Sequence, residues 1–170
     1  MKSRINLETD FLEFIALCNK HEVRYLVIGG YAVSIHGYPR STKDMDVCIE
    51  MSEENAAKMV RVIKDFGFGS LNLSEIDFLN KDFITQLGYE PLRIDILNDL
   101  DGVLFVEAWI NKKVVDLSGV RINFIGYNEL LKVKEKAGRP QDIADVNMLK
   151  KRNKSKEMSI QFSNGRQKKI

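Results

Sequence analysis

YLVIGG at residues 25–30 and DMDVCI at residues 44–49 are the two stretches that decide the fold. The first four residues of the earlier stretch form a continuous apolar run that is typical of a central strand, and the glycine pair predicts a turn after it. The later stretch alternates between polar and apolar side chains, as a strand with one buried face does. Because side chains two apart on a strand point to the same side, Asp44 and Asp46 should present their carboxylates together.

The sequence around these stretches alternates between helical and extended patterns. Apolar residues spaced three and four apart predict helices, and short apolar or alternating runs bounded by glycine and proline predict strands. Such interleaving indicates an α/β (α+β) domain in which helices cover a mixed sheet mainly on one face. The expected helices are residues 6–22, 31–36, a helix from Ser52 that ends at Gly67, 103–110, 128–137 and 141–150, and the expected strands are 25–28, 44–49, 83–87, 92–97, 113–117 and 120–125.

Length and charge favour one domain followed by a basic tail. A chain of 170 residues is long enough for one domain with a core and too short for two comfortable ones. The net charge is only +2, yet residues 150–170 carry eight Lys or Arg against the single acid Glu157, and the rest carries 18 basic and 23 acidic residues. We expect a domain at residues 1–150 and a flexible tail at 151–170, which either binds nucleic acid or only keeps the end solvated.

The composition is that of an ordinary cytoplasmic domain. No apolar run reaches the length that a bilayer requires, and the first ten residues lack the apolar stretch of a secretory signal. Cys18 and Cys48 lie in an expected helix and an expected strand, which fits buried, reduced thiols better than a disulfide. His21 and His36 are not at zinc-ligand spacing from either cysteine, so no zinc site is expected.

The glycine pair and three aspartates form a combination with a chemical use. Glycines before a helix let backbone N–H groups approach a phosphate closely, and the helix N-terminus favours an anion. Asp44 and Asp46 supply the oxygens that Mg²⁺ prefers, and Asp95, between isoleucines on a later strand, would add a third carboxylate. Carboxylates so placed can hold two metal ions and accept a proton from an attacking hydroxyl.

Each part of this combination also has a simpler explanation. Gly29-Gly30 alone would be a plain turn. Asp95 alone would be held by a salt bridge to a Lys or Arg, because an acid between buried neighbours needs a partner. The segment Asp99-Leu100-Asp101 repeats the Asp-x-Asp spacing, but it abuts Gly102, and we interpret it as a turn at a helix start.

Taken together, these residues resemble the DNA polymerase beta-like nucleotidyltransferase superfamily. Thirteen residues separate the second glycine from Asp44, and Ile94-Asp95-Ile96 is similar to the strand that carries the third carboxylate in that superfamily. More narrowly, the chain resembles the minimal group that includes abortive-infection toxins and lincosamide adenylyltransferases. The motifs that carry this resemblance are Gly29-Gly30-Tyr31-Ala32, His36-Gly37, Arg40-x-Thr42-x-Asp44-x-Asp46 and Lys134-x4-Arg139-Pro140-Gln141-Asp142.

The resemblance implies a phosphate-binding role for the first matching residues. Gly29 and Gly30 would hold the triphosphate of a nucleotide. Arg40 and Lys43 would contact phosphate by charge, and Thr42 would do so by its hydroxyl. Many members of the superfamily carry serine after the first glycine, whereas Gly30 offers only its backbone.

The resemblance also implies the metal-binding residues. Asp44 and Asp46 would bind two Mg²⁺ ions, and Asp95 would bind one of them and activate an acceptor hydroxyl. Lys134 and Asp142, on the two closing helices, match positions near the nucleotide in the toxin-like members; the simpler explanation for both is a solvated helix face.

Two functions of different classes follow from these observations. The first is a Mg²⁺-dependent enzyme in which an acceptor hydroxyl of a tRNA, a protein or a small molecule attacks the alpha-phosphate of a nucleoside triphosphate. The resemblance adds a toxin role with an antitoxin partner. The second is an inactive domain of the same fold that binds RNA or a partner protein through the basic tail. We favour the enzyme, because an inactive domain need not keep all three acids.

Overall fold

One mixed sheet of six strands organises the computed structural model, which describes residues 8–166. The strands are β1 (Tyr25–Ile28), β2 (Met45–Ile49), β3 (Ile84–Leu87), β4 (Ile94–Leu97), β5 (Lys113–Leu117) and β6 (Val120–Phe124). Their order in the sheet is β3-β4-β2-β1-β6-β5. β2 runs antiparallel to β1 and parallel to β4, so the two strands that carry the predicted acids are neighbours near the middle of the sheet.

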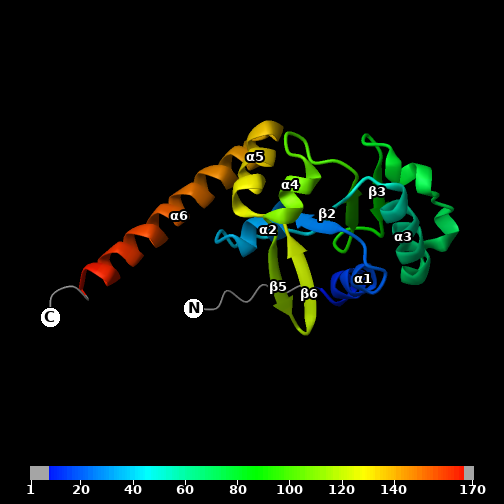
Figure 1. The fold of residues 1–170 in the computed structure, drawn as a ribbon, viewed down its shortest axis with the longest axis horizontal. Helices are drawn as coiled ribbons and strands as arrows, with labels where there is room; N and C mark the ends of the chain where they lie inside the picture. The colour runs from blue at the N-terminus through cyan, green and yellow to red at the C-terminus, as the bar shows by residue number, and fades with distance from the viewer. Residues whose placement is uncertain (1–7, 167–170) are drawn as a thin grey trace.

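Six α-helices connect and cover these strands in the described part of the chain (Figure 1). Ser52 begins α3 as predicted, because its hydroxyl accepts a hydrogen bond from the backbone N–H of Asn55 at 3.2 Å. The helices are α1 (Thr9–Lys20), α2 (Gly29–Ile35), α3 (Glu53–Ile63), α4 (Phe105–Ile110), α5 (Tyr127–Ala137) and α6 (Pro140–Arg166), with short helical turns η1 (Lys64–Phe68), η2 (Gly69–Leu71) and η3 (Glu75–Leu79).

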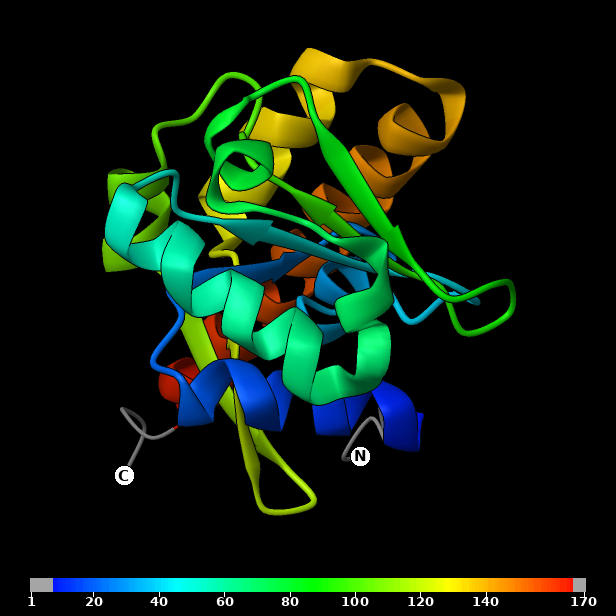
Figure 2. The same ribbon diagram turned by 90° about the vertical axis from the view of Figure 1, so that its right-hand side faces the viewer.

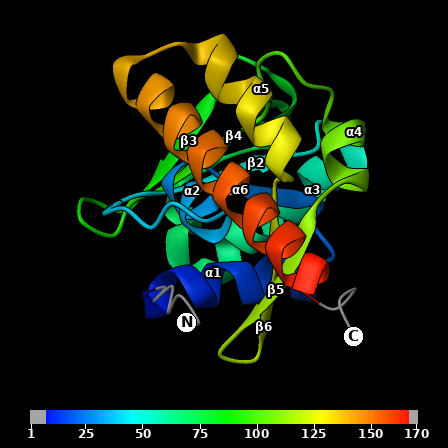
Figure 3. The same cartoon turned by 90° about the vertical axis from the view of Figure 1, so that its left-hand side faces the viewer.

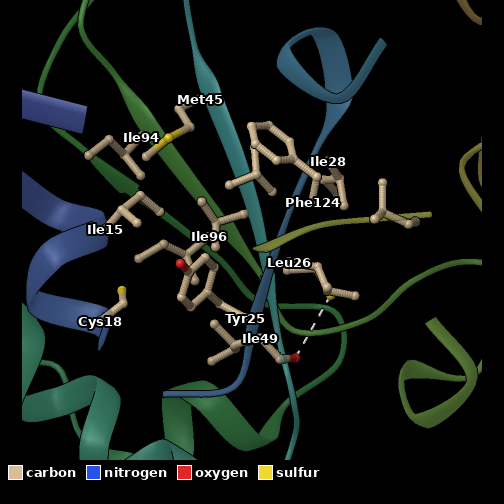
Figure 4. Close-up of a cluster of buried hydrophobic side chains, with 14 of the residues drawn as sticks. Ile15, Cys18, Tyr25, Leu26, Ile28, Met45, Ile49, Ile94, Ile96 and Phe124 are labelled. Atoms are coloured by element: carbon tan, nitrogen blue, oxygen red, sulfur yellow. Dashed lines mark hydrogen bonds between the residues drawn. The ribbon is translucent and has the colours of Figure 1, made fainter. Parts of the chain in front are cut away.

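The hydrophobic core lies between the sheet and the helices α1 and α3. Figure 2 shows these two helices together in front of the sheet. Ile15 and Cys18 of α1 face a set of buried strand side chains in Figure 4, and burying one large apolar side chain stabilises the fold by roughly 1.5–3 kcal/mol. The strand residues of this set that are fully buried or nearly so include Tyr25, Met45, Ile49, Ile94, Ile96 and Phe124.

The alternation of side chains along the strands places the predicted acids on the other face of the sheet. Met45 on β2 and Ile94 on β4 point into the core beside α1 (Figure 4). Asp46 and Asp95, one residue further along each strand, therefore point away from α1. Figure 3 shows α5 and α6 on that opposite side of the molecule. The predicted class, a mixed sheet with interleaved helices, is confirmed.

Two predicted helix boundaries are wrong. α2 begins at Gly29 and not at Tyr31, so the glycine pair forms the first turn of the helix. α6 continues to Arg166, although we expected it to end near Lys150. The physical reason is that residues 151–164 contain good helix formers and no glycine or proline, so a change of charge composition does not stop the helix.

The distal half of α6 projects away from the sheet (Figure 1). The division into a domain at residues 1–150 and a tail at 151–170 stays a prediction, but residues 151–166 have helical backbone, and 167–170 lie outside the described residues. Among the helices of residues 8–166, none is both long enough and apolar enough to span a bilayer.

Candidate active site

The register of β2 and β4 brings the predicted acids together. Asp46 lies directly opposite Asp95, and the backbone N–H of Met45 donates to the carbonyl oxygen of Arg93 at 3.1 Å. Because the strands are parallel and in register, Asp44 lies beside Arg93 in the same way. Two adjacent strands thus present three carboxylates and one guanidinium on one face.

Arg93 holds two of the three carboxylates. Its Nε and Nη2 donate to Oδ1 and Oδ2 of Asp95 at 2.8 and 3.0 Å, and Nη2 also donates to Oδ2 of Asp44 at 3.0 Å. The salt bridge that we considered as the simpler explanation for Asp95 therefore exists. It does not replace the predicted cluster, because the same guanidinium also ties Asp44 into it.

The carboxyl group of Asp46 has a raised pKa. Burial, together with the negative charges of Asp95 and Asp44, raises its pKa from 3.8 to about 6, while Lys134 and Arg139 act in the opposite direction. No described cation makes a salt bridge with Asp46, in contrast to the two other aspartates. The cluster therefore has unsatisfied negative charge at this carboxylate.

Gly29 is required by the approach of Asp46. A Cβ atom at position 29 would overlap Oδ2 of Asp46, and the backbone has φ +65°, a conformation that favours glycine. The first residue of α2 thus lies against a carboxylate of β2. The predicted glycine turn and the predicted Asp-x-Asp strand form one structural unit.

Gly30 is required by a different neighbour. A Cβ atom there would lie 2.6 Å from Oγ1 of Thr42 and 3.2 Å from Nη1 of Arg40. Thr42 and Arg40 therefore approach the backbone of the glycine pair closely, as their predicted phosphate role needs. Lys43 is exposed.

Arg40 also makes a firm contact that the sequence did not predict. Its Nε and Nη2 donate to Oδ1 and Oδ2 of Asp145 at 2.8 and 2.9 Å, and the carboxylate is fully buried. This bidentate pair ties the loop before β2 to α6. Only Nη1 lies near Gly30, so the main contact of Arg40 is the ion pair that joins the loop before β2 to α6.

Lys134 and Asp142 belong to the same buried ion cluster. The Nζ of Lys134 lies 3.0 Å from Oδ1 of Asp142 and 2.9 Å from Oδ2 of Asp145, and Arg139 donates to Asp142 at 2.6 Å. Burial opposes ionisation of Asp142, but hydrogen bonds from Arg139 and Lys134 hold its pKa below the usual value. The solvated helix face that we considered for Lys134 and Asp142 is wrong, because both are buried.

A cavity of about 350 Å³ opens beside the carboxylates. Asp46 and Asp95 line it together with Lys134 and Arg139. Such a volume is in the range of small-molecule sites. Asp99 and Asp101, which we interpreted as a turn only, also line it. The full lining is Ile28, Gly29, Asp46, Ile84, Gln86, Asp95, Leu97, Asp99, Leu100, Asp101, Leu130, Val133, Lys134, Ala137 and Arg139.

The donor set fits a divalent cation, although the side chains are not arranged around one. Asp44, Asp46 and Asp95 offer the hard oxygen ligands that Mg²⁺ prefers. Oδ1 of Asp44 is buried, and no described group donates a hydrogen bond to it, which leaves an acceptor that a cation would satisfy. As they stand, no three His, Cys, Asp or Glu side chains of residues 8–166 form a group that could hold a metal ion. Arg93 donates hydrogen bonds to both Asp44 and Asp95 in this arrangement.

The fold and the site define the class of the protein. The mixed sheet presents carboxylates from two neighbouring strand segments, with a glycine-led helix against them and a cavity of mixed polar and apolar lining beside them. The chain belongs to the family described as nucleotidyl transferase of unknown function (DUF2204), whose model matches residues 8–169. The predicted superfamily is thereby confirmed.

Solved structures show the same fold. TM1012 from Thermotoga maritima, a candidate nucleotidyltransferase, has a TM-score of 0.56 at 16% identity, over 91% of this chain and 99% of its own. The enzyme ANT(2″)-Ia in complex with adenylyl-2″-tobramycin has a TM-score of 0.54 at 9% identity, over 94% of this chain and 97% of its own. No curated protein matches the chain by sequence.

Proposed function

We propose that this nucleotidyltransferase is Mg²⁺-dependent and moves a nucleoside monophosphate from a nucleoside triphosphate to an acceptor hydroxyl. One observation carries the proposal: β2 and β4 place Asp44, Asp46 and Asp95 on one face, beside a cavity that also has cationic groups. The pKa of Asp46 is raised first by burial and then by the negative charges of Asp95 and Asp44. A site that gathers like charges near a cavity is suited to a cation and to a polyanion that shares the cation.

Each residue near the cavity has a distinct task in this proposal. Asp44 and Asp46 would hold the metal, and Asp95 would hold it from the neighbouring strand and accept the proton of the acceptor hydroxyl. When bound, Mg²⁺ would supply positive charge to the phosphate oxygens and so stabilise the charge that develops during transfer. The superfamily resemblance implies two such ions, and this number is part of the proposal.

The glycine pair and the cationic residues would bind the triphosphate. Gly29 is partly exposed at the start of α2, whereas Gly30 is buried with the Thr42 hydroxyl against it. Lys134 and Arg139 line the same cavity as Asp46, where their charges would face a phosphate. Lys43 would reach phosphate from the exposed loop, and Asp142 would act by holding Lys134 and Arg139 in place.

The acceptor is a tRNA, a protein side chain or a small molecule in this proposal. The complex of ANT(2″)-Ia with adenylyl-2″-tobramycin gives one fold neighbour in which an adenylyl group is joined to a small molecule, so ATP is the first donor to test. A toxin role with an antitoxin partner rests on the sequence resemblance. Buried, unpaired Cys18 and Cys48 fit a reducing compartment, and we place the protein in the cytoplasm.

A second function is favoured by the distal half of α6. Residues 150–166 carry six Lys or Arg and one acid, and this part of the helix projects from the sheet (Figure 1). An exposed basic helix is suited to RNA. The second candidate is therefore an inactive domain that binds RNA or a partner protein through α6.

Calorimetric titration with each nucleoside triphosphate in Mg²⁺ separates these functions. We expect micromolar binding of one nucleotide by the natural chain and no binding by the double variant Asp44→Asn/Asp46→Asn. The variant Glu157→Gln removes one acid from the exposed part of α6 and should bind like the natural chain. Binding that survives the double variant, or no binding of any nucleotide, would refute the enzyme and favour the RNA-binding domain.

A further inference from the structure

Arg93 lies beside the three carboxylates of the acidic cluster, those of Asp44, Asp46 and Asp95. Asp46 on β2 pairs with Asp95 on β4, and Asp44 and Arg93 are the residues directly before these two strands. The guanidinium binds both oxygens of Asp95 and one oxygen of Asp44. It therefore uses three of the carboxylate oxygens that a divalent ion would need.

The contacts of Arg93 leave part of the negative charge of the cluster without a partner. Asp46 lies beside Asp95 in the sheet and has no salt bridge with Arg93. Oδ1 of Asp44 is buried and receives no hydrogen bond from the described residues, although Oδ2 of the same side chain does. Arg93 therefore neutralises only part of the negative charge that the cluster presents, and a doubly charged ion would neutralise more of it.

Arg93 has an alternative position within reach. Its Nη1 lies 3.9 Å from Oε1 of Glu90, and its side chain is 27% exposed. An open cavity of about 460 Å³ borders this side of Arg93 and is lined by Gly88, Tyr89 and Glu90 among others. The guanidinium could turn from the cluster toward Glu90 through rotation of its own side chain, with no change in the sheet.

We propose that Arg93 is an internal cation that competes with the divalent ion for Asp44 and Asp95, and that metal binding displaces it toward Glu90. This inference rests on the proposed function, since it concerns the same metal site. It makes Arg93 a regulatory residue: the free protein keeps its acids paired, and its apparent affinity for metal is lowered by the fraction of molecules in which Arg93 is in place. A metal that arrives with a nucleotide overcomes this competition more easily than a metal alone.

A structural role for Arg93 gives the opposite expectation. If Arg93 only kept Asp95 and Asp44 in position, its loss would misplace ligands and weaken metal binding. Competition and positioning thus predict opposite signs for the same measurement. The measurement needs no nucleotide, no acceptor and no activity.

The test is a titration of the full chain with Mn²⁺ alone near pH 8, in which electron paramagnetic resonance measures the concentration of free ion. We expect Arg93→Gln to bind Mn²⁺ at least about tenfold more tightly than the natural chain, because a positive charge next to the ion is removed. The matched control is Arg24→Gln, which removes an equal charge outside the acidic cluster and no partner of Asp44 or Asp95. It should change the affinity less than about threefold.

Displacement in the natural chain is tested by NMR of the arginine Nε–H groups. Without metal, the Nε–H of Arg93 should give a resolved signal because it donates to Asp95. Addition of Mg²⁺ should move or broaden this signal, and Arg93→Lys, which keeps the charge without the two-pronged contact, should bind Mn²⁺ with an intermediate affinity.

Each remaining outcome overturns the inference in a recognisable way. Equal or weaker Mn²⁺ binding by Arg93→Gln would show that Arg93 is a positioning residue and leave the proposed function intact. The same conclusion would follow if other NMR signals changed on addition of Mg²⁺ while the Arg93 signal did not. If neither the natural chain nor Arg93→Gln bound Mn²⁺, both the inference and the metal-dependent function would fail.

Discussion

Replacing Asp46 with asparagine should stabilise the protein when no metal is present. Burial, Asp95 and Asp44 raise the pKa of Asp46 from 3.8 to about 6. Between about pH 4 and about pH 6, the folded protein holds a proton on Asp46 that the unfolded chain has released, so stability falls as the pH rises through this range. Above it, the ionised carboxylate destabilises the fold by roughly 3 kcal/mol.

Asparagine keeps the shape of the side chain and removes its charge. We therefore expect Asp46→Asn to raise the free energy of unfolding by about 2–3 kcal/mol near pH 7.5 in EDTA, and by about half of that near pH 5, where the natural side chain is already largely protonated. Urea unfolding followed by circular dichroism gives both values. The difference between the two proteins is the quantity to compare, because acids that lie far from Asp46 titrate equally in both.

Asp44→Asn is the matched control for this prediction. Asp44 lies two residues away, but its Oδ2 accepts a hydrogen bond from Arg93 at 3.0 Å. Loss of its charge removes a favourable pair, so this variant should not be stabilised. If Asp46→Asn were no more stable than the natural chain near pH 7.5 in EDTA, the reasoning from burial and carboxylate repulsion would be refuted.

Saturating Mg²⁺ should reverse the order of the two proteins. A ligand that binds only the folded state stabilises it in proportion to the logarithm of its concentration over Kd. The natural chain should therefore gain stability with Mg²⁺, and Asp46→Asn should not. This part of the prediction depends on the proposed metal role, whereas the experiment in EDTA does not.

Two further substitutions test the structure around the site. Gly29→Ala should destabilise the fold by more than Gly119→Ala, because both residues have positive φ but only the Cβ added at position 29 overlaps the carboxylate of Asp46. The control Gly119→Ala should lower the free energy of unfolding by about 1–2 kcal/mol. Equal losses for the two variants in urea unfolding would contradict the close approach of Gly29 and Asp46. Lys134→Met should lower the free energy of unfolding by roughly 3 kcal/mol, because it strips a cation from two buried carboxylates on α6, whereas Lys150→Met, which breaks an exposed pair, should lose less than about 1 kcal/mol. Similar losses in the last two variants would refute the importance of burial.

Short-range patterns predicted most of the fold. The strands at residues 25–28 and 44–49, the hairpin at 113–125 and the cap at Ser52 all depend on neighbours within a few residues, and the structure has them. The same is true of the Asp44 and Asp46 pair, since two-residue periodicity fixes which side chains share a face. The end of α6 was missed because helix propensity, and not charge, decides where a helix stops.

Short-range sequence patterns cannot predict the contacts in the site between residues that are far apart in the chain. Asp145 pairs with Arg40 across 105 residues of sequence, and no local signal marks it. Arg93 is different, because it lies two residues before Asp95 and therefore on the same face of β4. The same periodicity that groups the aspartates also places Arg93 in the cluster, so the sequence carries a signal for this residue.

The absence of a side chain at position 30 is explained by packing against the loop before β2. The resemblance to the superfamily suggested a missing hydroxyl at Gly30. A Cβ there would lie 2.6 Å from Oγ1 and 2.7 Å from the Cβ of Thr42, so any side chain at position 30 excludes threonine at position 42 in this backbone. The hydroxyl of Thr42 fills the space into which a serine at position 30 would project. Glycine at 30 and threonine at 42 therefore depend on each other, and the glycine pair keeps a hydroxyl beside it through a residue twelve positions later in the chain.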